Sequence, residues 1–141
     1  MTHRAQCHCG NIVALFDTAL SFEVLGVREC KCSFCQKHKA LYITDPQGKL
    51  SITVNSQSEL NQYSFATKTI EFLVCRTCGV CIAATFLDEG KRYGVLNART
   101  FDDTLLQLPE ARFMDYDTET TEERVRRRRT YWTPMGTLNI G

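Results

Sequence analysis

The stretch Cys75-Arg76-Thr77-Cys78-Gly79 decides how this chain folds. Its two thiols lie three positions apart, and the glycine after the second lets the backbone turn its amides toward the sulfurs, as in a zinc knuckle. A second pair, Cys7 and Cys9, lies near the start of the sequence. The two pairs together supply four thiolates, a set that tetrahedral zinc prefers. Because this site has no position for a substrate, the spacing predicts a structural zinc that joins distant parts of the core.

A third cluster, made of Cys30, Cys32 and Cys35, differs in kind. It supplies three thiolates from one expected strand-to-helix turn. Three protein ligands with one open position are typical of a catalytic zinc. In the alternative, Cys81 or His38 is a fourth ligand and the second site is structural too. For Cys81 we favour burial as a small apolar side chain on a strand.

A disulfide framework is the other explanation for eight cysteines in a chain of this size. The residues before the first cluster show no apolar stretch resembling a signal peptide, and no later run approaches the length of a membrane span. Neighbouring cysteines in a Cys-x-Cys motif also pair poorly with each other. We therefore expect a cytoplasmic protein with reduced thiols that bind metal.

Length and charge set the remaining limits. The chain has 141 residues, is 43% apolar and carries a formal net charge of +1. This size suits one domain with a modest core. Because the near-neutral charge gives no general attraction to nucleic acid or membrane, we expect neither as a partner and favour a small molecule or a protein.

The pattern of apolar and polar residues predicts a mainly β fold. Strands are expected at residues 11–16, 40–44, 50–54, 62–65, 69–74, 81–86 and 93–96, with turns at 45–48 and 88–91. Strands at this spacing are typical of antiparallel sheets. Only residues 32–39 and 121–129 are expected to form short helices.

The segment after residue 117 is highly charged. Three glutamates precede five arginines between residues 119 and 129, so i, i+4 pairs favour an exposed, solvated helix. Contact of the arginines with nucleic acid or a partner chain is the alternative. Residues 131–135 are apolar enough to dock on the domain or across a dimer, so a homodimer is left open.

Three segments of the chain resemble the glutathione-dependent formaldehyde-activating enzyme family, which also contains centromere protein V. They are residues 7–12, 30–37 and 72–80, and the similarity extends to residues 60–65 and 94–102. As a set in the same order and at similar spacings, they are specific. The resemblance implies a zinc-stabilised β-tent of antiparallel sheets over residues 1–116. Residues 117–141 are then a charged helix and tail, packed on that domain or extending from it.

The resemblance also implies two zinc ions per chain and an enzyme activity. The structural zinc falls on Cys7, Cys9, Cys75 and Cys78, and the catalytic zinc on Cys30, Cys32 and Cys35. The implied activity is that of a carbon-sulfur lyase, which makes S-(hydroxymethyl)glutathione from glutathione and formaldehyde. Centromere protein V suggests the alternative of a zinc-stabilised binding module without catalysis.

The chemistry of the open site favours a thiol substrate such as glutathione. Three thiolates on Zn²⁺ leave a net charge of −1, which suits exchange of a soft sulfur ligand better than activation of water. A thiol entering the open position would lose its proton, and its sulfur could then attack a carbonyl carbon. Basic residues outnumber acidic ones around the cluster: Arg28, Lys31, Lys37 and Lys39 stand against Glu29. They either offset the anionic complex, hold a substrate carboxylate, or are simply solvated.

Overall fold

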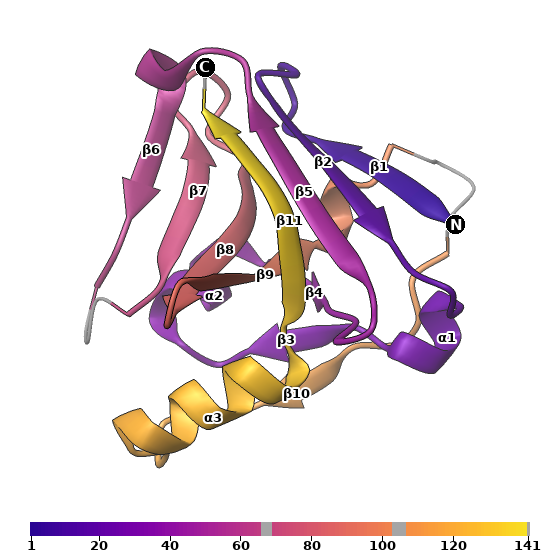
Figure 1. The fold of residues 1–141 in the computed structure, drawn as a ribbon, viewed down its shortest axis with the longest axis vertical. Helices are drawn as coiled ribbons and strands as arrows, with labels where there is room; N and C mark the ends of the chain where they lie inside the picture. Colours follow the sequence, from indigo (N-terminus) through magenta and orange to yellow (C-terminus); the bar gives the residue numbers. More distant parts are fainter. Residues whose placement is uncertain (66–68, 103–106, 141) are drawn as a thin grey trace.

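The computed structural model describes residues 1–65, 69–102 and 107–140 of the chain. Parts of the expected domain at residues 66–68 and 103–106, and residue 141 of the expected tail, lie outside this description. The fold is mainly β, as predicted. Figure 1 shows two groups of strands that approach each other at one end and diverge toward the other, like the sides of a tent.

The first group of strands forms one side of the tent. Its members are β1 (Thr2–Gln6), β2 (Ile12–Asp17), β5 (Lys49–Val54) and β11 (Thr133–Ile140). β1, β2 and β5 pair antiparallel, in a register that sets Phe16 opposite Leu50. β11 adds to β5 in parallel, a pairing that the sequence did not predict. It arises because the preceding helix returns the chain to the end of the sheet where β5 begins (Figure 1).

The second group forms the other side and the floor. Its antiparallel meander consists of β6 (Leu60–Tyr63), β7 (Glu71–Cys75), β8 (Cys81–Asp88) and β9 (Lys91–Asn97). Beyond β9 lie β4 (Tyr42–Ile43), β3 (Arg28–Cys30) and β10 (Arg112–Met114), and β10 pairs parallel to β3. β9 also pairs with the first two residues of β11. β11 therefore belongs to both sides of the molecule.

Helical segments are short and lie around the sheets. They are α1 (Phe22–Leu25), α2 (Ser33–His38), α3 (Thr121–Tyr131) and the 3₁₀ turns η1 (Gln57–Glu59) and η2 (Ala98–Thr100). α2 and α3 confirm the two predicted helices. α3 begins with a capping box, in which the Thr120 hydroxyl accepts from the Glu123 amide and the Glu123 carboxylate accepts from the Thr120 amide.

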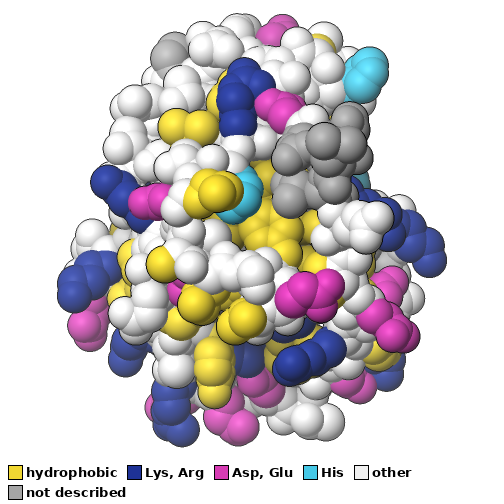
Figure 2. All heavy atoms as spheres, turned by 90° about the vertical axis from the view of Figure 1, so that its right-hand side faces the viewer, with side chains coloured by type: hydrophobic (Ala, Val, Ile, Leu, Met, Phe, Trp, Pro, Cys, Tyr) yellow, Lys and Arg dark blue, Asp and Glu magenta, His cyan; other side chains and the backbone are white. Residues whose placement is uncertain are grey.

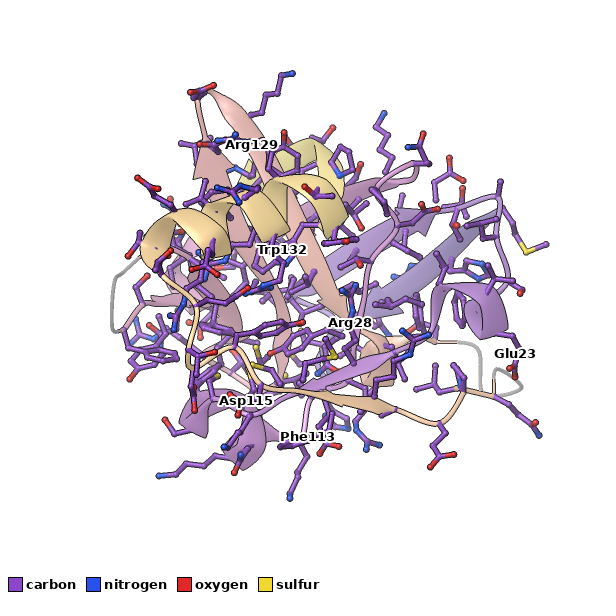
Figure 3. The ribbon with its side chains drawn as sticks, turned by 90° about the horizontal axis from the view of Figure 1, so that it is seen from below. Glu23, Arg28, Phe113, Asp115, Arg129 and Trp132 are labelled. Carbon is purple, nitrogen blue, oxygen red and sulfur yellow. The ribbon has the colours of Figure 1, made fainter. Side chains whose placement is uncertain are left out.

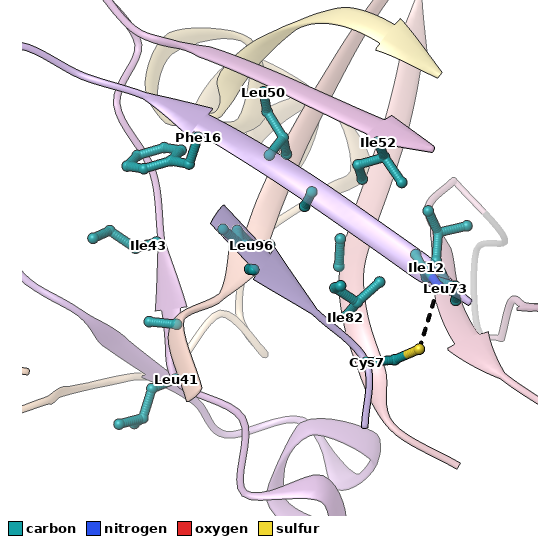
Figure 4. Packing of buried hydrophobic residues seen from close by; sticks show 14 of the residues in the cluster. Cys7, Ile12, Phe16, Leu41, Ile43, Leu50, Ile52, Leu73, Ile82 and Leu96 are labelled. Carbon is teal, nitrogen blue, oxygen red and sulfur yellow. Dashed lines mark hydrogen bonds between the residues drawn. The ribbon is translucent and has the colours of Figure 1, made fainter. Parts of the chain in front are cut away.

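Two apolar clusters fill the interior. The larger lies between the two sides of the tent, and Figure 4 shows its side chains pointing inward from several strands. Its fully buried members include Ile12, Phe16, Ile43, Leu50, Ile52, Leu73, Ile82 and Leu96. The smaller cluster surrounds Cys35 and contains Tyr42, Phe72, Phe86 and Trp132. Each of the two apolar clusters packs against one of the cysteine groups.

On the face shown in Figure 2, acidic and basic side chains are interspersed among apolar ones, in keeping with the near-neutral net charge. Among the residues that the structure describes, no helix has the length and apolar character needed to cross a bilayer.

Candidate metal centres

The first centre is the group of Cys7, Cys9, Cys75 and Cys78, whose Sγ atoms all lie within 4.8 Å of one another. The sulfurs of Cys9 and Cys75 are 3.5 Å apart, and those of Cys7 and Cys9 are 3.8 Å apart. The first two cysteines follow β1, whereas the other two lie at the β7–β8 turn. The group therefore joins the two sides of the tent.

Two similar turns bring these sulfurs together. In the first, the Gly10 amide donates to the Cys7 carbonyl; in the second, the Gly79 amide donates to the Cys75 carbonyl. Both glycines have a positive φ, +86° for Gly10 and +80° for Gly79, which a side chain would disfavour. These glycines allow each chain reversal within a few residues, so each pair of thiols points to one side.

Part of this group lies in the core: Cys7 and Cys75 are buried, Cys78 is half-buried and Cys9 is exposed. Cys7 and Cys75 belong to the larger apolar cluster, and burial raises the pKa of the Cys7 thiol. Burial also acts to raise the pKa of Cys78, but amide hydrogen bonds from Val80 and Cys9 outweigh it and lower this pKa to about 6. The Ile12 amide donates to the Cys7 sulfur at 3.3 Å. Sulfurs held in the core in this way suit a metal that stabilises the fold.

The second centre consists of Cys30, Cys32 and Cys35, whose Sγ atoms also lie within 4.8 Å of one another. Cys30 ends β3, Cys32 is the N-cap of α2, and Cys35 lies in the first turn of that helix. The Cys32 sulfur accepts from the Cys35 amide at 3.4 Å. In the described part of the chain, no fourth histidine, cysteine or carboxylate joins this group.

Neither candidate fourth ligand is a member of the second centre. His38 is exposed, and its ring stacks beside Phe34 with centroids 4.4 Å apart. Cys81 is only 2% exposed and lies on β8, where its sulfur contacts the Ala83 carbonyl at 4.0 Å. Burial raises the pKa of the Cys81 thiol to about 12, so this side chain stays protonated at neutral pH. This is the packed arrangement that we favoured from the sequence.

The three thiols of the second centre share hydrogen bonds. Those from Cys30 and Cys35 lower the pKa of the Cys32 thiol well below its usual range. Hydrogen bonds with Cys30 and Cys32, together with burial, raise the pKa of Cys35. The Tyr42 hydroxyl lies 3.3 Å from the Cys35 sulfur, and burial raises the Tyr42 pKa. Tyr42 therefore remains protonated and can donate to the sulfur.

A cavity of about 140 Å³ opens beside the second centre. One wall carries the three cysteines, and a second is apolar, with Phe72 and Trp132 among its residues. The third wall is cationic, because α3 contributes Arg124, Arg127 and Arg128. Figure 3 shows α3 lying across this end of the molecule, with Trp132 beneath the helix and Arg129 on its outer side. The second centre thus faces a partly apolar, positively charged cavity.

The position of α3 corrects the expectation of a fully solvated helix. Arg128 is 5% exposed and three of the arginines line the cavity. The ion pairs also differ from the predicted i, i+4 pattern: Arg127 binds Glu119 at 3.0 Å, and Arg129 binds Asp88 at 2.7 Å. Arginines three and four positions apart share one helix face, so the sequence did hold this signal. The sequence alone favours solvated arginines, because it does not show which part of the protein a helix face packs against.

The basic residues near the second centre have different surroundings. Of the four counted in the sequence, Arg28 lines the cavity and donates to the Thr44 hydroxyl. Lys31 instead pairs with Asp115 at 3.1 Å, and Lys37 and Lys39 are exposed. Tyr42, Arg124 and Arg128 are among the cavity residues that sequence reasoning missed, because their roles depend on contacts between distant segments.

The fold and the two centres define a class of protein: a mainly β domain with two cysteine groups suited to metal ions. The model of the family described as "Glutathione-dependent formaldehyde-activating enzyme" matches residues 2–116 of this chain. The chain therefore belongs to the glutathione-dependent formaldehyde-activating enzyme family. Both cysteine groups lie inside the matched region, whereas α3 and β11 lie outside it.

A solved structure supports the fold. The crystal structure of a Rhodobacter sphaeroides protein aligns with a TM-score of 0.58 and 24% sequence identity, covering 79% of this chain and 99% of that one. At this identity the likeness shows the fold alone. No curated protein matches the sequence.

Proposed function

We propose that this protein is a zinc-dependent enzyme of the carbon-sulfur lyase type, acting on a thiol adduct such as S-(hydroxymethyl)glutathione. One observation carries the proposal: the sulfurs of Cys30, Cys32 and Cys35 border a cavity, and among the described residues no fourth ligand completes their group. A purely structural site would be closed. Membership of the family supports glutathione and formaldehyde as the first substrates to test.

The cysteine groups fit two zinc ions with different roles. Cys7, Cys9, Cys75 and Cys78 offer four sulfurs to a structural zinc, and Cys30, Cys32 and Cys35 offer three to a catalytic one. Zinc held by the three cysteines would supply an open position at which a thiol gives up its proton. Because both groups need reduced sulfurs, we also propose a cytoplasmic location.

The residues of the chain prepare the cavity for this reaction. The Tyr42 hydroxyl lies against Cys35 and fixes the orientation of that sulfur. The aromatic wall formed by Phe72 and Trp132 limits access of water. In the proposed step, the thiolate sulfur forms a bond to the aldehyde carbon while the carbonyl π bond breaks, and the oxygen takes up a proton. The product is the S-(hydroxymethyl) adduct, and the reverse step releases the aldehyde.

The test is thiol binding to protein purified under reducing conditions. Elemental analysis should find about two zinc ions per chain. Glutathione should bind more tightly as pH rises, by about tenfold per unit until pH nears the free thiol pKa of about 8.5, because binding requires the thiol proton to leave. Calorimetry in buffers of different ionisation enthalpy would detect the released proton.

Two results would contradict the proposal. Iron with labile sulfide, or no metal, would show that the cofactor is wrong. Absence of thiol binding at millimolar concentration, in protein with both zinc ions in place, would exclude the thiol mechanism. The second result would favour a zinc-stabilised binding module of the centromere protein V type.

A further inference from the structure

The cationic wall of the cavity comes from α3, which lies beyond the region matched by the family. Arg124, Arg127 and Arg128 follow one another at helical spacing and all line the cavity. Arg28 faces the same cavity from β3. Among the described lining residues, Asp117 is the one carboxylate, so Asp117 and the cysteine sulfurs are the anionic groups that face these four arginines.

Arg127 is already satisfied by its neighbours. Its Nε donates to both carboxylate oxygens of Glu119, at 3.1 and 3.0 Å. Its guanidinium also stacks over the Tyr116 ring, 3.5 Å from the centroid. The chain therefore holds Arg127 in place, and Glu119 already offsets its charge.

Arg128 and Arg124 are less well satisfied. Arg128 is 5% exposed and donates from one Nη to the Thr69 hydroxyl at 2.7 Å, but its buried Nε has no partner within the described residues. Arg124 donates from one Nη to the Tyr116 carbonyl at 3.3 Å, and its buried Nε also has none there. Each guanidinium has five N–H donors, so both retain unused capacity next to the cavity.

Arg128 keeps its charge at neutral pH. Burial lowers the pKa of Arg128 to about 10, with a smaller contribution from the positive charges of Arg127 and Arg124. The charge is therefore lost only as pH rises through about 10. A buried guanidinium without an anion is costly, and a carboxylate is the partner that its planar fork fits best.

We propose that Arg124 and Arg128 bind a carboxylate of the substrate whose thiol enters the second cysteine centre. This inference rests on the proposed function and adds a selection rule: acidic thiols are preferred over neutral thiols of the same shape. The competing role is balance of charge, in which the arginines only offset the net charge of −1 on three thiolates with zinc.

The test compares glutathione with its diethyl ester, which keeps the thiol but has no free carboxylate. Calorimetry on the zinc-loaded full chain at pH 7 should show that glutathione binds about tenfold more tightly, as expected for charge-assisted hydrogen bonds. Arg124→Gln should remove most of this preference while both zinc ions stay bound. Arg126→Gln is the matched control, because Arg126 is exposed on the same helix and does not line the cavity.

Arg128→Gln should act in the same direction as Arg124→Gln. If loss of the buried Arg128 side chain makes this variant unstable, the binding of the two thiols to Arg124→Gln tests the inference by itself. Equal binding of the two thiols to the unaltered protein would overturn the inference while leaving the proposed function intact. Equal weakening of both thiols by Arg124→Gln, together with loss of zinc, would also overturn it and establish charge balance. Failure of both thiols to bind would overturn the proposed function, and this inference with it.

Discussion

Cys81 lies three positions beyond the knuckle, yet its sulfur belongs to neither cysteine group. It points into the smaller apolar cluster, together with Cys35 and Tyr42. Spacing alone makes Cys81 resemble a third knuckle ligand, and only the direction of β8 decides that the side chain packs instead. At this residue, position in a strand determines the chemistry available to the thiol.

Cys81→Ala tests this interpretation. We expect the variant to keep both zinc ions and to lose about 1 kcal/mol of unfolding free energy, because only one sulfur atom is removed from a packed site. Elemental analysis and denaturant unfolding measure the two quantities. Loss of one zinc ion from a folded variant would mean that Cys81 is a ligand, and would favour an inert module.

The seven remaining cysteines show what local sequence can predict about a site. Thiols two or three positions apart must lie close together, so the members of each cluster could be grouped from spacing. Tyr42 and Arg128 could not be assigned, because each meets the second centre only through the fold. Their contributions come from pairings between segments that are distant in sequence.

At the scale of elements, strands with a clear apolar alternation were predictable, whereas strands that are very short or mostly polar were not. β2 and β5 alternate buried with more exposed residues, and their positions were close to expectation. β1 has the sequence Thr-His-Arg-Ala-Gln, with one fully buried side chain. β3 and β10 contain three residues each, too few to establish a period. Such strands exist because neighbouring strands supply their hydrogen bonds.

The turns that carry the two cysteine groups predict opposite responses to mutation. Cys75→Ser removes a ligand of the proposed structural zinc, which would join the two sides of the tent at the β7–β8 turn, so we expect unfolding or aggregation. Cys32→Ser acts at the start of α2, and we expect a folded protein that has lost one zinc ion and no longer binds thiols. Thermal unfolding and zinc analysis of both variants distinguish the structural group from the reactive one. Equal damage from the two changes would show that the groups are not divided into structural and reactive roles.

At the scale of the whole molecule, the resemblance to the family indicated the mainly β fold, but the pairing of its last strand could not be read from the sequence. β11 contains Pro134 and Gly136, which weaken any local strand signal. Its parallel pairing with β5 depends on the place at which the chain leaves α3. The connection between the two sides is therefore a property of the assembled molecule.

This placement of β11 has a consequence for synthesis on the ribosome. β5 appears early in the nascent chain, but its partner emerges more than seventy residues later, so the edge of β5 stays unpaired while the rest of the domain is made. The closed cysteine group is complete once Cys78 has emerged, so the proposed structural zinc would fasten the two sides before that edge is covered. We expect a chain ending at residue 132 to retain this zinc but to be cleaved by protease within β5. Protection of β5 in the shortened chain would show that β11 is not needed to cover it.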